Sequence, residues 1–384
     1  MQETREDDTA TTKRSSPGNH HERLIDRKVK DLMVSKRRLV EVPYTASLAH
    51  TMNALVANRV VALPVAAPPG HWIGAGGSMI METDKQTGAV RKHYIGMVTM
   101  LDILTHIGGV DKAMDVRDGT SDLDRKMSVE VSSIIGHCLE GLSLWTLNPN
   151  TSILDCMEVF SKGIHRALVP VDGQMENISG VEMVESASSY RMLTQMDLLK
   201  FLKEHEPELQ SITSNPINLL GAVTYDVYAI TERTTVLEAI KCMRTAMLNA
   251  VPIVKSSDSS QEHSDQLVNG RGRKLIGTFS ATDLRGCHLA TLQSWLPVSA
   301  LDFTETISCS PVNAASNIAA GTPARVLVCC EAEASLGEVI DKVVTKHVHR
   351  VWVVDSQYSL VGLVSLSDVI RVSRASLLSQ GNMV

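Results

Sequence analysis

The sequence predicts an α+β fold built from four copies of one small module, and three observations support this prediction. A phrase made of an apolar strand, a hydroxyl residue and an aspartate three positions later occurs four times. Its aspartates are 95, 86 and 85 residues apart, a spacing that suits one small module each. An amphipathic helix precedes the phrase in every copy. The four aspartates are Asp102, Asp197, Asp283 and Asp368.

The first helix of each module is predicted by an apolar stripe and a start signal. Apolar residues recur at positions i, i+4 and i+7, which share one face of a helix. In three copies an acid follows the first hydroxyl residue by three positions, as in a capping box, whereas the first copy has His50 there. The hydroxyl residues that open these helices are Ser47, Ser152, Thr235 and Ser335.

Two strands and a second helix are expected after the first helix of each copy. The first of these strands is expected at residues 60–65, 167–171, 250–254 and 351–354. The second strand ends at the hydroxyl residue of the repeated phrase, which then opens the second helix. With a strand before the first helix, each module is expected to read strand, helix, strand, strand and helix. Between the two strands lie segments rich in Gly, Ser, Pro and charge, at residues 66–92, 172–188 and 255–274. Such inserts are typical of a tolerant surface edge, so the two strands can pair as a hairpin with helices on one face.

Composition limits the classes of function. The 384 residues exceed what one hydrophobic core usually fills, and 43% apolar with 21% charged residues indicates a globular chain. A net charge of −6 and only 4% aromatic residues argue against nucleic-acid binding. No apolar run approaches the ~20 residues that span a bilayer, and no secretory signal is visible. The odd count of seven cysteines without a C-x-x-C pair favours a reduced protein, so we expect a cytoplasmic or nuclear location.

The repeated aspartates can have two roles, which are compatible. A hydroxyl residue with an acid three positions later is an ordinary N-cap, because the hydroxyl accepts a backbone N–H and the acid lies near the positive end of the helix. An ionised carboxylate can also accept hydrogen bonds from both hydroxyls of a ribose. Free N–H groups at a helix N-terminus favour the anionic parts of such a ligand. The neighbouring hydroxyl residues are Thr99, Thr194, Ser280 and Ser365.

A nucleotide site needs positive charge to bind phosphate, and only the even repeats have a His-Arg pair that could supply it. Repeats 2 and 4 have a His-Arg pair between the first helix and the following strand. Near that point repeat 1 has Val60-Val61 and repeat 3 has Leu248-Asn249. The His-Arg pairs are His165-Arg166 and His349-Arg350. His347 and His349 alone do not form a metal site, because no carboxylate or cysteine at ligand spacing joins them.

These residues, in this order and fourfold, resemble the CBS domain, named after cystathionine beta-synthase, whose tandem pairs are called Bateman modules. The likeness covers about residues 28–375. Four copies with no other domain attached are similar to the gamma regulatory subunits of AMP-activated and plant sucrose-non-fermenting-related protein kinases, and look most like a plant gamma-like branch. The domains expected are a flexible tail at 1–24, CBS repeats at 25–109, 140–210, 211–295 and 323–384, and linkers at 110–139 and 296–322.

The resemblance implies a disk made of two Bateman modules, with AMP, ADP or ATP bound in clefts near its centre. It also implies a chain without catalytic activity or a required cofactor. Its partners would be a protein kinase catalytic subunit and a beta-type scaffold subunit, with no nucleic acid and no membrane span. The alternative function is a CBS scaffold that binds partner proteins without sensing nucleotide.

In this family the ribose aspartate of one repeat faces the His-Arg pair of its partner repeat. The pairs implied here are Asp102 with His165 and Arg166, and Asp283 with His349 and Arg350. Asp368, beside Ser365, is a third candidate. Asp197, beside Thr194, is the weakest candidate, because Arg191 replaces a glycine that is expected to let a ligand approach in the other copies.

Overall fold

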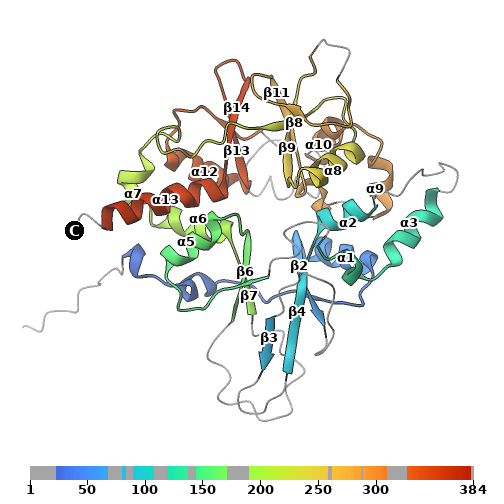
Figure 1. The fold of residues 1–384 in the computed structure, drawn as a ribbon, viewed down its shortest axis with the longest axis horizontal. Helices are drawn as coiled ribbons and strands as arrows, with labels where there is room; N and C mark the ends of the chain where they lie inside the picture. Colours follow the sequence, from blue (N-terminus) through green and yellow to red (C-terminus); the bar gives the residue numbers. More distant parts are fainter. Residues whose placement is uncertain are drawn as a thin grey trace, which may run out of the picture.

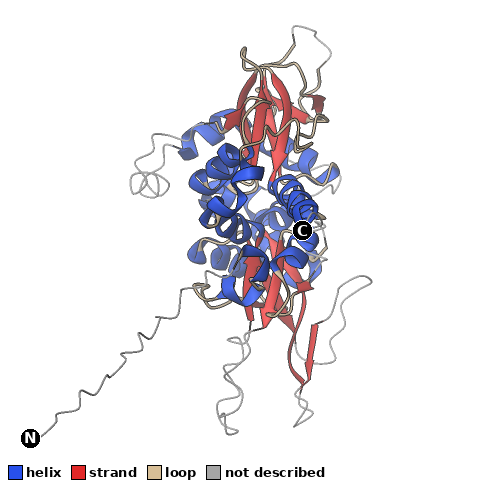
Figure 2. Cartoon of the chain, turned by 90° about the vertical axis from the view of Figure 1, so that its left-hand side faces the viewer, coloured by secondary structure: helices blue, strands red, loops and turns tan. Residues whose placement is uncertain are grey.

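The computed structural model describes residues 23–67, 80–83, 90–107, 119–136, 144–170, 190–257, 262–286, 289–308 and 327–381. Viewed down its shortest axis, the molecule has four α/β units in four quarters (Figure 1). From the side, the strands gather at the top and bottom and the helices lie between them (Figure 2). No helix in the described part of the chain is long and apolar enough to cross a membrane.

The predicted order of strand, helix, strand, strand and helix is confirmed in repeats 1, 2 and 4, whereas in repeat 3 a 3-10 turn stands where the second helix was expected to begin. Repeat 1 contains β1 (Val42–Pro43), α1 (Leu48–Asn58), β2 (Ala62–Ala67), β3 (Ile80–Thr83), β4 (Val90–Thr99) and α2 (Met100–Ile107). Repeat 2 contains β5 (Trp145–Thr146), α5 (Ile153–Ser161), β6 (Arg166–Pro170), β7 (Tyr190–Thr194) and α6 (Gln195–Glu204). Repeat 3 contains β8 (Tyr228–Thr231), α8 (Val236–Thr245), β9 (Ala250–Val254), β10 (Val268–Asn269), β11 (Leu275–Ser280) and the 3-10 turn η5 (Asp283–Gly286). Repeat 4 contains β12 (Cys329–Cys330), α12 (Leu336–Lys346), β13 (Arg350–Val354), β14 (Leu360–Ser365) and α13 (Leu366–Gly381).

The four sheets share one topology. The short first strand of each repeat runs parallel to the second strand, which pairs antiparallel with the strand that carries the repeated phrase. Two further strands extend this plan: β3 pairs with β4, and β10 pairs with β8. Both lie in segments that the sequence analysis assigned to irregular surface loops. That assignment is wrong for these residues, because a Gly- and Ser-rich composition does not prevent a short apolar stretch from pairing.

The connecting segments also contain helices. They are η1 (Leu24–Asp26), η2 (Val29–Met33), α3 (Gly119–Ser128), η3 (Val131–Ile134), α7 (Glu206–Thr213), α9 (Leu289–Trp295) and α10 (Ala300–Ser308). The domain boundaries stay a prediction, but α3 and α10 occupy segments expected to be linkers. In every repeat the residue that caps the first helix forms a β-bridge with a connecting segment. These bridges are Ser47 with Glu130, Ser152 with Lys28, Thr235 with Ser299, and Ser335 with Pro216.

Sheet faces pair repeat 1 with repeat 2 and repeat 3 with repeat 4. The first pair of sheets buries Ala62, Leu168 and an edge-to-face contact between Tyr94 and Tyr190, whose ring centroids are 5.9 Å apart. The sheets of repeats 3 and 4 bury a matching cluster around Trp352. This is the pairing that the resemblance implied.

The helices pair the repeats differently, joining repeat 1 with repeat 3 and repeat 2 with repeat 4. The core of repeats 1 and 3 contains residues of α1, α2, α8 and α10. The core of repeats 2 and 4 contains residues of α5, α6, α12 and α13, together with Val29 and Leu32 from the N-terminal segment. Each repeat therefore shares one apolar cluster on its sheet with one neighbour and another on its helices with a second neighbour, which fixes the ends of its strands relative to two other repeats.

Candidate functional site

The repeated aspartates cap the helices that follow them, as predicted. In repeat 1 the backbone N–H and the hydroxyl of Thr99 donate to Asp102 Oδ2 at 2.8 and 2.6 Å, and the Asp102 N–H donates back to the Thr99 hydroxyl at 3.2 Å. Repeats 2 and 4 contain the same three hydrogen bonds, and each donor–acceptor distance differs from that in repeat 1 by no more than 0.2 Å. Local geometry therefore accounts for the hydroxyl and the acid at a spacing of three.

Repeat 3 departs from this pattern in the contacts of its hydroxyl residue. The Ser280 N–H donates to Asp283 Oδ2 at 2.8 Å, but the Ser280 hydroxyl lies against the Thr282 hydroxyl and accepts the Thr282 N–H at 3.2 Å. The chain here enters the 3-10 turn η5 instead of an α-helix. Repeat 4 also has a hydroxyl at this position, Ser367, but it accepts a hydrogen bond from Gln195 at 2.8 Å and Ser365 keeps the full motif. The difference in repeat 3 therefore accompanies the contact between Ser280 and Thr282, in which one side chain competes with the capping bond.

Strand register places the His-Arg pairs directly beside the capping motifs. The hydroxyl residue that ends the third strand lies opposite Arg166 in repeat 2 and Arg350 in repeat 4. In repeats 1 and 3 the same position holds Ala62 and Ala250. The residue that follows each hydroxyl residue donates its N–H to a carbonyl at the start of the neighbouring strand. This carbonyl belongs to the residue just before Ala62, Arg166, Ala250 or Arg350, that is, to Val61, His165, Asn249 or His349. The positions equivalent to His-Arg are thus Val61-Ala62 and Asn249-Ala250, one residue later than the sequence comparison assigned.

Arg350 connects the two repeats of its module. Its Nη1 donates to the carbonyl oxygen of Ala250 at 3.0 Å, across an interval of 100 residues. Because Ala250 lies opposite Ser280 in the register, this contact brings the guanidinium of repeat 4 to the strand end at which the Asp283 motif begins. The geometry therefore agrees with a coupling of Asp283 to the His-Arg pair of repeat 4.

The loop that leads into each of these strands contains a residue in the left-handed region. Gly163 has φ 89°, whereas the equivalent residues Arg59, Met247 and His347 have φ between 52° and 55°. Arg59 and His347 are the C-caps of α1 and α12, and a residue in this conformation is a common way to end a helix. In each repeat this residue lies two positions before the one that accepts the strand-end hydrogen bond: Val61, His165, Asn249 or His349.

The even aspartates carry ion pairs that the sequence analysis missed. Lys36 Nζ donates to Asp197 Oδ2 at 2.6 Å, and Arg371 Nη2 donates to Asp368 Oδ1 at 3.2 Å. Arg371 lies three residues after its partner on a helix, a spacing that could have indicated the pair. Lys36 lies 161 residues before Asp197, so no local signal could have revealed it.

The four aspartates also differ in exposure. Asp102 is 0% exposed and Asp283 is 7% exposed, whereas the side chains of Asp197 and Asp368 are 19% and 16% exposed. The odd aspartates are therefore the more deeply buried pair. A ligand could reach the carboxylate of Asp102 only if the groups covering it moved.

The glycines before the hydroxyl residues have a packing role. A Cβ on Gly362 would lie 2.6 Å from the carbonyl oxygen of Thr224, and one on Gly277 would lie 2.9 Å from Leu301. The expectation that glycine serves ligand approach is therefore wrong for these two positions, because neighbouring segments of the chain fill the space. The ranking of Asp197 by its neighbour Arg191 loses that support, and the Arg191 guanidinium donates to the Tyr190 carbonyl at 3.1 Å.

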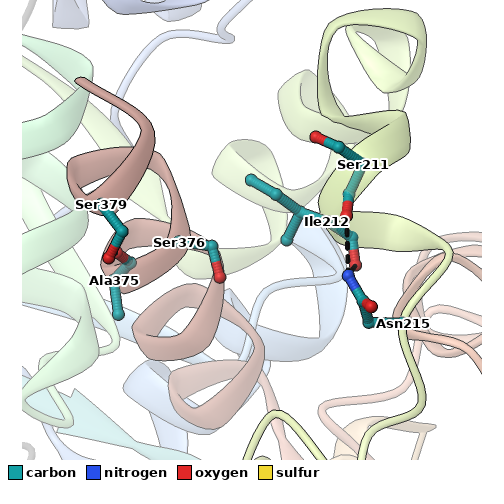
Figure 3. Close-up of a pocket in the computed structure, with 6 residues that line it drawn as sticks. All are labelled: Ser211, Ile212, Asn215, Ala375, Ser376 and Ser379. Atoms are coloured by element: carbon teal, nitrogen blue, oxygen red, sulfur yellow. Dashed lines mark hydrogen bonds between the residues drawn. The ribbon is translucent and has the colours of Figure 1, made fainter. Parts of the chain in front are cut away.

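A hollow of about 340 Å³ lies elsewhere, between the end of α7 and the last turns of α13 (Figure 3). Its lining residues are Ser211, Ile212, Asn215, Ala375, Ser376 and Ser379. The Asn215 amide donates to the carbonyls of Ser211 and Ile212, so part of its polarity is already used. No candidate site residue lines this hollow, and its lining carries no charged side chain. Within the described ranges no three His, Cys, Asp or Glu residues gather closely enough to hold a metal ion.

Comparison with known proteins relates the chain to a small group of regulatory subunits. The CBS domain model matches residues 318–375. The SNF1-related protein kinase regulatory subunit gamma-like PV42a of Arabidopsis thaliana is 63% identical over 93% of this chain and 97% of its own length. The corresponding subunit PV42b of the same plant is 57% identical over 94% of this chain and 98% of its own length.

More distant similarities agree with the architecture. The 5'-AMP-activated protein kinase subunit gamma-3 of Sus scrofa is 25% identical over 89% of this chain and 55% of its own length. The crystal structure of MJ1225 of Methanocaldococcus jannaschii, whose title relates it to g-AMPK, superposes with a TM-score of 0.57 at 17% identity. It covers 90% of this chain and 99% of the archaeal chain, which supports the fold of all four repeats.

Proposed function

The chain belongs to the family of gamma-like regulatory subunits of SNF1-related protein kinase, and on this premise we propose that it binds adenine nucleotide between paired repeats and regulates a protein kinase complex. Membership confirms the resemblance to the plant gamma-like branch. The relatives are named as regulatory subunits, which supports a chain without catalytic activity of its own.

The best candidate for the nucleotide site is the junction of repeats 3 and 4. There Asp283 supplies a carboxylate for the ribose hydroxyls, while His349 and Arg350 supply donors for the phosphate. The observation that carries this proposal is the contact of Arg350 with Ala250, which brings a guanidinium from repeat 4 to the motif of repeat 3. A guanidinium suits phosphate because its donors are planar and permanently charged.

The equivalent junction of repeats 1 and 2 is the second candidate site. It combines Asp102 with His165 and Arg166, and the register places Arg166 at the same strand position as Arg350. The full burial of Asp102 makes this site dependent on a local rearrangement. We therefore rank it below the junction of repeats 3 and 4.

Regulation would follow from a shift between two arrangements of the disk. A nucleotide that contacts two repeats at once stabilises the arrangement in which those contacts fit best. The kinase catalytic subunit and a beta-type scaffold subunit would bind one arrangement more tightly than the other, and this difference is the coupling free energy between nucleotide and partner.

Calorimetric titration with AMP, ADP and ATP tests nucleotide binding. We expect the affinity to fall by about tenfold or more in Arg350→Met, because a hydrogen bond to a charged group contributes ~1.5–3 kcal/mol. Asp283→Asn should weaken binding without removing Arg350. The control is Arg271→Met, since Arg271 is an exposed arginine that lies over the ring of Tyr225 and outside every motif.

Absence of binding to the unmodified chain at millimolar nucleotide would contradict the proposal. That result would favour the alternative, a scaffold that binds partner proteins without sensing nucleotide. The burial of Asp102 and the ion pairs at Asp197 and Asp368 support this alternative. Binding to the kinase and scaffold subunits, unchanged by nucleotide, would be its signature.

A further inference from the structure

We infer that Lys36 closes the repeat 2 site to nucleotide by pairing with Asp197, so that this residue helps to determine which aspartates of the disk can bind a ligand. The inference deepens the proposed function and rests on it for the identity of the ligand. Asp197 follows a hydroxyl residue by three positions, as Asp283 does, but it also forms an ion pair with Lys36 from a distant segment.

The ion pair occupies the oxygen on which the whole motif converges. Asp197 Oδ2 accepts the Thr194 N–H at 2.9 Å, the Thr194 hydroxyl at 2.6 Å and the Lys36 ammonium at 2.6 Å. Three donors on Oδ2 leave that oxygen no further lone-pair direction, so a ribose could use only Oδ1 and could not bind its two hydroxyls across both oxygens of the carboxylate. The ammonium also neutralises the charge that would make the carboxylate a strong acceptor.

The backbone on both sides of Lys36 is anchored in two different cores. On its N-terminal side, η2 buries Val29 and Leu32 in the helical core of repeats 2 and 4. The N–H groups of Val29 and Lys30 donate to the carbonyls of Thr151 and Pro149 at 2.9 and 2.8 Å. On its C-terminal side, Leu39 is buried in the sheet core of repeats 1 and 2.

This anchoring makes the ion pair different from an ordinary surface pair. The side chains of Lys36 and Asp197 are only 21% and 19% exposed, so water screens their attraction less than it does for exposed pairs. The segment is already held by backbone hydrogen bonds and apolar burial, which reduces the entropy lost when the ammonium is fixed. A ribose at Asp197 would have to displace a preformed internal partner.

Repeat 4 offers a useful contrast. Arg371 contacts the other oxygen, Oδ1, of Asp368 at 3.2 Å, and its side chain is 49% exposed. Such a half-exposed contact is readily exchanged for water or ligand. Closure of the site by an internal cation is therefore assigned to repeat 2 and not to repeat 4.

Counting bound AMP by equilibrium dialysis of the full chain tests this inference. We expect Lys36→Met to bind one more AMP per chain than the unmodified protein. The double variant Lys36→Met with Asp197→Asn should lose that additional site. Lys30→Met, an exposed lysine on the same anchored segment, and Lys36→Arg, which keeps the ion pair, should both leave the count unchanged.

Each outcome separates the inference from the proposed function. If the unmodified chain binds no AMP but Lys36→Met binds one, sensing by the natural protein fails and the closure stands. An equal count in the two proteins overturns the closure, even if both bind AMP. A lower count in Lys36→Met also overturns it, because Lys36 would then be a contact of the nucleotide. Urea unfolding of Lys36→Met and Lys36→Arg verifies that both variants are folded.

Discussion

The half of the disk formed by repeats 2 and 4 and the half formed by repeats 1 and 3 contain the same module but hold it together with different contacts (Figure 1). In the first half, polar side chains reach between repeats: Gln195 donates to the Ser367 hydroxyl at 2.8 Å, and Arg374 to Glu158 at 2.7 Å. In the second half, aromatic rings meet within repeat 3 and the helices that follow it. The ring centroid of Phe303 lies 5.9 Å from that of Phe279 and 5.4 Å from that of Trp295.

The same difference recurs at the aspartates. Those of repeats 2 and 4 are partly exposed and ion-paired, whereas those of repeats 1 and 3 are buried. Because all four keep the same bond from the backbone N–H of the hydroxyl residue, local capping is independent of the surroundings of the carboxylate. The motif therefore serves a common structural role in all four copies, while the surroundings of its carboxylate differ between the two halves.

The largest expected effect is the loss of an aromatic ring from the half formed by repeats 1 and 3. Phe303 is fully buried, and Phe303→Ala should lower the free energy of unfolding by ~3–5 kcal/mol, because it leaves a cavity between two other rings. Arg374→Met in the other half should cost only ~1–2 kcal/mol, since it removes a partly exposed ion pair and one hydrogen bond to the carbonyl of Leu154 but leaves no large cavity. Urea unfolding midpoints compare the two variants, and equal losses would show that the two halves do not differ in this way.

Removal of the capping carboxylates should give the next largest difference. Asp102→Ala leaves the N–H and the hydroxyl of Thr99 without their buried acceptor, so we expect a loss of ~2–3 kcal/mol. Asp368→Ala exposes its donors to water and should cost only ~1 kcal/mol, as an ordinary cap does. Thermal and urea unfolding measure both changes. A larger cost at Asp368 would contradict the contrast in burial.

The smallest expected effect is a change in the pH dependence of stability. The hydrogen bond from Lys203 of repeat 2 lowers the pKa of Asp341 in repeat 4 below its ordinary value of 3.8. A carboxyl whose pKa is lower in the folded state stabilises the protein above pH 3.8, and this contribution disappears as the pH falls through the lowered folded pKa.

Thermal melting of Asp341→Asn between pH 6 and 2 tests this effect. We expect the variant to lose less stability than the unmodified chain in the acid range below about pH 3.8. Lys203→Met should give the same flattening, because it removes the donor of the same pair. A profile identical to that of the unmodified chain would mean that this contact between repeats does not contribute to stability.

The sequence predicted those features that are encoded locally. The capping residues Ser47, Ser152, Thr235 and Ser335 each accept the N–H three positions later, even in the first copy, where His50 replaces the acid. Periodicity and caps are properties of short segments, so they appear in the sequence without knowledge of the fold. The succession of helices and strands and the hairpin were likewise predicted from the residues, whereas the pairing of repeats could be expected only through the family resemblance.

The features that the sequence did not reveal depend on contacts between distant segments. The Lys36 pair and the contact of Arg350 with Ala250 join residues at least 100 positions apart. The one-residue offset in the positions equivalent to His-Arg arose because α1 and α5 end with different turns, at Arg59 and at Lys162-Gly163. Only the strand register defines which residues lie opposite one another.

A crystal structure of the chain soaked with AMP would show directly which aspartates bind nucleotide. We expect nucleotide at the junction of repeats 3 and 4, with its ribose against Asp283 and its phosphate near Arg350, and no nucleotide at Asp197 while Lys36 remains paired with it. Nucleotide bound at Asp197, or an empty Asp283 at saturating AMP, would refute this assignment of the sites.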